Sequence, residues 1–166
     1  MAESREPQTP HEVAPHQDGE DGPRRRIAAV GDLHCRYDMQ GKLRPLFMNV
    51  DMEAEVLVLC GDLTDRGTAD EAEILAAELS GVRIPMVGVL GNHDYETGHG
   101  DDVRRILTQA GVKILDGEYW ILDDGLGFAG AKGFAGGFGD HVLQAWGEGP
   151  IKDFVMSAQD EALKLE

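Results

Sequence analysis

The chain has 166 residues and a mass of 18.0 kDa, which suits one domain with its own hydrophobic core. Its 31 Asp and Glu residues outnumber its 15 Lys and Arg residues, and the resulting net charge of −16 disfavours nucleic acid and anionic membranes as partners. No apolar run approaches the ~18 residues of a membrane span, and two cysteines make no disulfide framework, so we expect a cytoplasmic protein.

Residues 1–26 are predicted to form a disordered tail. This segment holds four of the seven prolines and almost no large apolar side chains, so it cannot bury a core. It also lacks the apolar stretch of a secretory signal. The remaining residues, 27–166, are expected to form a single domain.

Short apolar runs that stop at a glycine predict the first strands. These runs are Ile27–Val30, Val56–Cys60 and residues 84–90. Continuous apolar runs of this length are typical of strands that are buried on both faces. Further short strands are expected at residues 112–115, 119–122 and 127–129.

Helices are predicted between and after these strands, at about residues 39–49, 68–80, 101–110 and 151–165. The clearest begins at Thr68, which forms a capping box with Glu71. The next is expected to be capped by Asp101, whereas the segment over residues 39–49 is less regular because it contains Pro45. Alternation of strands and helices predicts an α/β fold with a mainly parallel sheet.

Each of the three apolar runs is followed at once by polar residues that can bind metals. The segments are Gly31-Asp32-Leu33-His34, Gly61-Asp62-Leu63-Thr64-Asp65-Arg66-Gly67 and Gly91-Asn92-His93-Asp94. Because the carboxyl ends of parallel strands share one edge of the sheet, these segments are expected to converge there. Carboxylate together with imidazole suits Mn, Fe or Zn better than Ca or Mg.

This ordered series resembles the calcineurin-like metallophosphoesterase family over about residues 27–139. The resemblance implies a four-layer α/β/β/α sandwich with two divalent metal ions at the sheet edge, either Mn²⁺, Fe²⁺/Fe³⁺ or Zn²⁺. It implies that Asp32 and His34 hold one metal and that Asp62 bridges both. It also implies that Asn92 holds the second metal and contacts the substrate phosphate.

The same resemblance implies the reaction. A phosphomonoester or phosphodiester would be hydrolysed by a hydroxide that bridges the metals, with His93 as the general acid. Asp94 would orient His93, while Arg66, and Asp65 with it, would either support the metal ligands from behind or lie on the phosphate side of the site. Hydrolysis of a phosphoester by a metal-dependent phosphatase or phosphodiesterase is therefore the first functional hypothesis.

The chain departs from the family pattern in its C-terminal half. The family supplies a lone histidine and then a Gly-His-x-His pair there, and this sequence has neither. The last strands of the second sheet are also expected to be absent. Either a missing C-terminal segment or a second copy completes the site, or the chain is a catalytically inactive scaffold that binds a partner protein.

A Gly-x-Gly-x-x-Gly pattern at residues 125–130 points to a different class, a nucleotide-binding oxidoreductase. That fingerprint requires a helix immediately afterwards, and a glycine-rich stretch follows instead. We therefore reject the nucleotide site. The resemblance places this loop near the metal edge, where Lys132 either meets the substrate or is simply solvated.

Overall fold

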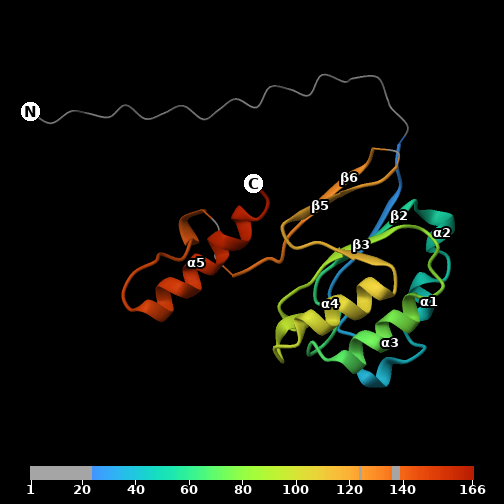
Figure 1. Cartoon of the computed structure of the whole chain (residues 1–166), viewed down its shortest axis with the longest axis horizontal. Helices are drawn as coiled ribbons and strands as arrows, with labels where there is room; N and C mark the ends of the chain where they lie inside the picture. The colour runs from blue at the N-terminus through green and yellow to red at the C-terminus, as the bar shows by residue number, and fades with distance from the viewer. Residues whose placement is uncertain (1–23, 124, 136–138) are drawn as a thin grey trace, which may run out of the picture.

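The computed structural model describes residues 24–123, 125–135 and 139–166, so most of the predicted tail lies outside the described residues. A four-stranded parallel sheet has the order β1-β2-β3-β4, and a separate antiparallel hairpin pairs β5 with β6 (Figure 1). The strands are β1 (Ile27–Val30), β2 (Val56–Cys60), β3 (Met86–Val89), β4 (Val112–Ile114), β5 (Glu118–Ile121) and β6 (Gly127–Gly130). The predicted α/β class is confirmed.

The register of the parallel sheet aligns the ends of its first strands. Val30 of β1 lies beside Leu59, and Cys60 at the end of β2 lies beside Val89. The glycines that follow these strands therefore reach the same edge, as predicted. β2 and β3 are largely buried, but β1 is an edge strand whose Ile27 is 48% exposed, so its predicted burial on both faces is wrong.

Helices cover one face of the parallel sheet (Figure 1). The helical elements are η1 (Tyr37–Met39), α1 (Arg44–Phe47), α2 (Val50–Glu53), α3 (Ala69–Leu79), η2 (His93–Tyr95), α4 (Gly100–Gln109), η3 (Gly139–His141) and α5 (Gly149–Leu163). Leu75 of α3 and Leu107 of α4 are fully buried against Leu59 in the main core. The capping box of α3 forms as predicted, whereas His99 rather than Asp101 occupies the N-cap of α4.

The predicted helix over residues 39–49 is wrong, because this segment breaks into η1, α1 and α2. Gly41 adopts a φ of 79°, which ends helical geometry. The buried Glu78 carboxylate of α3 then accepts backbone N–H groups from Gly41, Leu43 and Arg44 at 2.6, 2.9 and 2.6 Å. These bonds satisfy amides that a continuous helix would have paired internally.

The opposite face of the sheet packs against the hairpin in a second, smaller core. Val56 and Val87 of the sheet are buried in this core, and Trp120 and Phe128 of the hairpin pack against them. α5 then contacts the hairpin side near its C-terminal end, where Lys164 pairs with Asp116 at 2.7 Å. The rest of α5 projects away from the sheet (Figure 1), so the outer helical layer of the expected sandwich is only partly formed.

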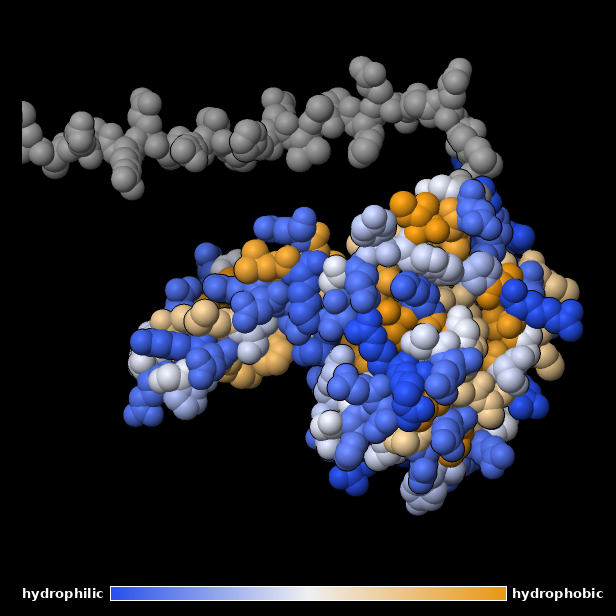
Figure 2. Space-filling model, in the orientation of Figure 1, coloured by the Kyte–Doolittle hydropathy of each residue, from blue (hydrophilic) through white to orange (hydrophobic). Residues whose placement is uncertain are grey.

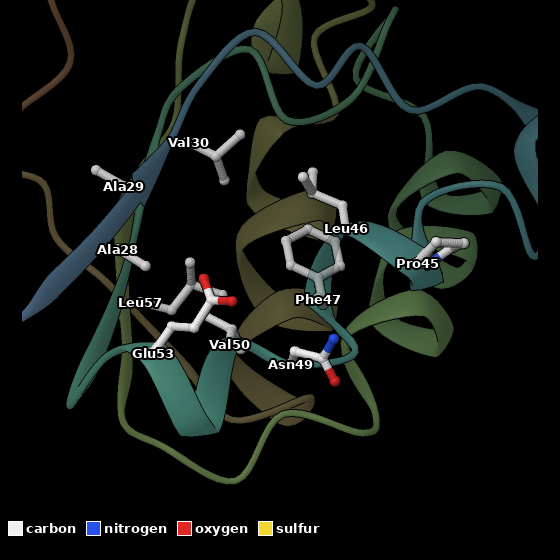
Figure 3. A pocket seen from close by; sticks show the side chains of 10 residues that line it. All are labelled: Ala28, Ala29, Val30, Pro45, Leu46, Phe47, Asn49, Val50, Glu53 and Leu57. Carbon is white, nitrogen blue, oxygen red and sulfur yellow. The ribbon is translucent and has the colours of Figure 1, made fainter.

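A cavity of about 240 Å³ lies between β1 and the short helices α1 and α2 (Figure 3). Its walls are mainly apolar, with Phe47 and Leu57 among the lining residues and Asn49 and Glu53 as the polar exceptions. It contains none of the predicted site residues. This cavity therefore does not belong to the edge at which the polar segments converge.

The Gly-x-Gly-x-x-Gly segment ends in strand β6, and residues 131–135 form no helix after it. The dinucleotide interpretation therefore lacks its required helix, as expected from the sequence. Among the described residues, no helix has the length and apolar character that crossing a membrane requires.

Candidate metal centre

Three of the predicted site residues meet at the carboxyl edge of the sheet. His34 follows β1, Asp62 follows β2 and His93 follows β3, and one ligand atom from each lies within 4.8 Å of the others. Among the residues that the structure describes, no other group of three His, Cys, Asp or Glu side chains comes together in this way. The predicted convergence of three polar segments is therefore observed.

Parallel pairing continues past the strand ends and holds the first two loops together. The Asp32 amide donates to the Gly61 carbonyl at 3.1 Å, and the His34 amide donates to the Asp62 carbonyl at 3.0 Å. The loop after β1 is thus hydrogen-bonded to the loop after β2, although neither is counted as strand. This pairing sets the separation of His34 and Asp62.

Backbone strain is concentrated in the same loops. Asp32, His34 and Asp62 have φ values of 52°, 43° and 49°, and they are the non-glycine residues with positive φ in the described part of the chain. Such conformations cost on the order of 1–3 kcal/mol each and persist only where the surroundings impose them. All three belong to the predicted metal ligands, which indicates that the loops are shaped for a function rather than for stability.

The third loop approaches Asp62 closely. A Cβ atom on Gly91 would collide with the Asp62 carboxylate and its backbone nitrogen, so only glycine fits there. The His93 backbone N–H donates to Asp62 Oδ1 at 2.9 Å. The loop after β3 thus orients the Asp62 carboxylate, whose two oxygens retain further lone pairs for cations.

The imidazole of His93 is held by the loop that contains Asp65. His93 Nδ1 lies 2.7 Å from the Asp65 carbonyl, which can only accept, so Nδ1 carries the proton. This hydrogen bond is the main cause that raises the pKa of His93 above its usual range, and the nearby Asp62 carboxylate adds to it. The His93 ring also stands edge-on to the His34 ring, with centroids 4.4 Å apart.

Asp94 occupies a different place from the one expected. Its fully buried carboxylate accepts the backbone N–H groups of Leu63, Thr64 and Gly91 at 3.1, 2.8 and 2.8 Å, and the Thr64 hydroxyl at 2.6 Å. The contacts of the His93 ring run instead to the Asp65 carbonyl. Asp94 therefore joins the loops after β2 and β3 rather than orienting the imidazole.

Asp32, Asp65 and Arg66 lie around the cluster but are not part of the group of three. The Asp32 side chain is 82% exposed, and its Oδ1 lies 4.0 Å from His34 Nε2, so it is at the rim of the cluster. Asp65 Oδ1 lies 3.6 Å from His34 Nδ1, which is closer than Asp32. The exposed Arg66 guanidinium lies 3.8 Å from Glu96.

An open pocket of about 480 Å³ adjoins Asp62. Its lining includes Asp62 and Asn92, which follow β2 and β3. Gly133, Phe134 and Ala135, which follow β6, line it as well. The loop after β6 therefore lies at the metal edge, as the resemblance implied, whereas Lys132 itself pairs with Glu161 at 3.9 Å.

Sequence reasoning missed two features of this site. It assigned His93 to acid chemistry alone, although the imidazole lies within the group of possible metal ligands. It also overlooked Phe134, because the resemblance placed the loop after β6 near the metal edge but only Lys132 was singled out in that loop. The Asp65 carbonyl that holds His93 belongs to a motif that was recognised, but a backbone contact has no sequence signal.

The cluster fits a divalent transition metal. Two donors bound to one ion at about 2.1 Å each lie at most about 4.2 Å apart, so donors within 4.8 Å need only small side-chain rotations to share an ion. Two imidazoles and one carboxylate suit Zn, Fe or Mn. The proton on Nδ1 of His93, donated to a carbonyl, is the arrangement usual for ligating histidines.

Comparison with known proteins agrees with the geometry. One solved crystal structure superposes on 69% of this chain with a TM-score of 0.53 at 12% sequence identity, and the matched region is 55% of that structure's chain. This chain therefore spans about half the length of that structure, and the likeness concerns the fold alone. No curated protein matches the sequence. The sequence model described as calcineurin-like phosphoesterase matches residues 25–155, and the chain belongs to this family.

Proposed function

We propose that the protein hydrolyses phosphoesters, either monoesters or diesters, with the help of divalent metal ions. The observation that carries this proposal is the meeting of His34, Asp62 and His93, with ligand atoms within 4.8 Å, at the edge where three strained or tightly packed loops converge. Family membership supports the reaction class. The open pocket beside Asp62 gives a substrate access to this edge.

In the dinuclear form of the proposal, Asp32, His34 and Asp62 hold one cation, and Asp62 with Asn92 holds the other. Bound Mn²⁺, Fe²⁺/Fe³⁺ or Zn²⁺ would supply Lewis-acid stabilisation of the phosphoryl oxygens and a water of lowered pKa. The exposed Asp32 side chain places its Oδ1 4.0 Å from His34 Nε2, a separation at which two donors can share one ion. Asp62 is the side chain on which both metal positions depend.

In this dinuclear form His93 is not a metal ligand, because a metal-bound Nε2 would carry no proton to donate, and proton transfer is assigned to it. Its Nδ1 is committed to the Asp65 carbonyl, so Nε2 is the atom that exchanges a proton. A raised pKa keeps more of the imidazole in the acid form near neutral pH, which suits donation to a departing alkoxide. Asn92 in the pocket and the exposed Arg66 guanidinium are proposed to contact the phosphate.

The test is hydrolysis of bis(p-nitrophenyl) phosphate and p-nitrophenyl phosphate by the full chain with added Mn²⁺. Asp62→Asn keeps the shape of the side chain but removes its charge, and Asp123→Asn makes the same change at an exposed turn. We expect Asp62→Asn to lower kcat/KM by ~100-fold or more, because even groups that merely support metal ligands contribute 10–100-fold. Asp123→Asn should leave turnover unchanged.

A non-catalytic scaffold is the second candidate function. Within residues 24–123, 125–135 and 139–166 the structure brings together one group of three ligands, fewer than two cations need. Tight Mn²⁺ binding without turnover of either ester would favour the scaffold. Absence of both binding and turnover would contradict the hydrolase proposal and leave the cluster without a metal function.

A further inference from the structure

The pocket beside the metal cluster is larger than one phosphate group needs. Its volume of about 480 Å³ falls within the ~300–1,000 Å³ of pockets that bind small organic molecules. Asp62 and Asn92, which follow β2 and β3, line the same pocket as Phe134, which follows β6. A phosphoester bound with its phosphate at Asp62 would therefore have Phe134 in the wall of the space left for its organic group.

Phe134 offers a held aromatic ring to that organic group. The ring is 39% exposed. It packs edge-on against Phe154 of α5, with centroids 5.2 Å apart and an interplanar angle of 63°. Lys132 Nζ lies 4.9 Å from the same ring centroid. Because two neighbours already contact the ring, little side-chain freedom remains to be lost when a ligand packs on it.

α5 stabilises this wall through a second contact. Lys132 is only 17% exposed, lies 3.9 Å from the Glu161 carboxylate and stands 5.7 Å from the Tyr95 ring. The residues before and within the pocket wall are thus anchored both to α5 and to the segment that follows His93. Lys132 is engaged in these contacts and its Nζ lies over the Phe134 ring, so the exposed remainder of that ring is the distinctive chemical feature of the wall.

We propose that Phe134 makes the site selective for phosphoesters whose organic group is a planar aromatic ring, with the ring stacked on Phe134 and the phosphate at the Asp62 end. This inference rests on the proposed function, since it assigns the phosphate to the metal cluster. Aromatic pairs gain affinity beyond the burial of their surface, so the selectivity should appear in binding as well as in turnover.

Equilibrium binding to the full chain in the presence of Mn²⁺ tests the inference without requiring catalysis. Isothermal titration calorimetry compares phenyl phosphate with ethyl phosphate, which carry the same charged group. We expect phenyl phosphate to bind about tenfold tighter, which corresponds to about 1.4 kcal/mol. Inorganic phosphate serves as the reference ligand for the metal cluster alone.

Variants assign the preference to the ring. Phe134→Leu keeps an apolar contact with Phe154 but removes the aromatic face, and the phenyl-to-ethyl preference should fall to about twofold. Phe134→Trp should restore about tenfold or more. Tyr119→Leu makes a similar change at a 74% exposed ring of the hairpin that does not line this pocket, and it should leave the preference intact.

Two results would overturn the inference while the proposed function stands. One is equal affinity for phenyl and ethyl phosphate in the unmodified protein that still binds phosphate. The other is an unchanged preference in Phe134→Leu. Failure of all three phosphate ligands to bind the Mn²⁺-treated protein would instead reject the proposed function, and the inference with it.

Discussion

At the scale of single residues, Asp94 shows how a buried carboxylate organises the candidate site. Its four hydrogen bonds reach the loops after β2 and β3, and it is fully buried. Asp94→Asn keeps the size of the side chain but replaces one acceptor oxygen with a donor that faces backbone N–H groups. We expect the free energy of unfolding to fall by about 2–4 kcal/mol and Mn²⁺ affinity to fall ~10-fold or more.

Urea unfolding and metal titration measure both effects, with Asp123→Asn at an exposed turn as the control. If Asp94→Asn lowered turnover without changing the free energy of unfolding or the metal affinity, Asp94 would act on His93, as the sequence suggested. The structure leads us to expect the opposite pattern.

The strained backbone at Asp32 gives a second prediction. Its φ of 52° favours glycine, and its side chain is largely exposed, so Asp32→Gly removes strain without opening a cavity. Without metal, the free energy of unfolding of Asp32→Gly should equal that of the unmodified protein or exceed it by up to about 1 kcal/mol. Asp70→Gly, on the exposed surface of α3, should lose about 1 kcal/mol in the same urea experiment.

Mn²⁺ affinity distinguishes the proposed role of Asp32 as a metal ligand from its effect on stability. If the proposed ligand set is right, Asp32→Gly binds Mn²⁺ more weakly although its stability is unchanged or greater. A marked fall in the free energy of unfolding of the metal-free variant would show that the Asp32 side chain itself stabilises the positive φ. The strain could then not be attributed to metal binding.

Residue identities at the sheet edge were predictable, but their contacts were not. Asp32, His34 and Asp62 follow strands that end in glycine, and parallel strands bring such positions together. Two partners of Asp94, the backbone N–H groups of Leu63 and Thr64, lie about thirty residues away along the chain, and no side-chain pattern reveals such backbone contacts. For the same reason, the sequence could not show that the Asp65 carbonyl holds His93.

At the scale of secondary-structure elements, the Glu78 carboxylate takes the place of the backbone carbonyls that a regular helix would have supplied as acceptors. Its carboxylate accepts three backbone N–H groups from the segment between η1 and α1. Glu78→Gln leaves one oxygen for these three donors, so we expect the free energy of unfolding to fall by about 2 kcal/mol or more. Glu73→Gln, on the exposed side of the same helix, should change it by less than about 0.5 kcal/mol in the same urea experiment.

Comparable destabilisation in both variants would show that the loss of helix charge, rather than the bonds to the 41–44 segment, decides stability. The difference between the two also explains why this segment was mispredicted. Its apolar spacing is compatible with a helix, but the positive φ of Gly41 and a carboxylate from a distant helix determine the observed path. The strands were easier to predict, because glycine ends each apolar run and marks its boundary.

At the scale of the whole molecule, a metal that binds three loops should stabilise the entire domain. The proposed ligands His34, Asp62 and Asn92 each follow a different strand of the sheet, so unfolding of any part separates them. At a concentration 100 times Kd, Mn²⁺ adds about 2.7 kcal/mol to the folded state. For a chain of this size, Tm should rise by roughly 5–10 °C.

Differential scanning calorimetry with and without a chelator measures this shift, and Asp62→Asn provides the matched variant. A similar rise in Tm for Asp62→Asn would indicate that Mn²⁺ binds elsewhere on this acidic chain, whose net charge is −16. Such sites would respond strongly to added salt, because exposed charges are screened within about 10 Å at 0.1 M ionic strength.

The projecting helix α5 distinguishes this molecule from a closed sandwich. Val155 is its buried residue, whereas Ile151, Phe154 and Met156 are 44–49% exposed. Figure 2 shows apolar and polar side chains mixed over this projecting part. The sequence predicted the helix but not its direction, because a periodic pattern identifies apolar residues and not the element against which they pack. Its contacts through Phe154 and Glu161 nevertheless connect it to the pocket wall.

The hydrogen bonds that carry parallel pairing beyond β1 and β2 also determine how a cation enters. The amides of Asp32, His34 and Cys35 are bonded to backbone carbonyls of the neighbouring loop, and these bonds involve none of the ligand side chains. The backbone entropy of ordering these loops is therefore lost when the chain folds and not when it meets its cofactor. Binding then requires only side-chain rotation and the release of water. The backbone of these loops is therefore expected to keep the same path when one cation leaves and the next one binds.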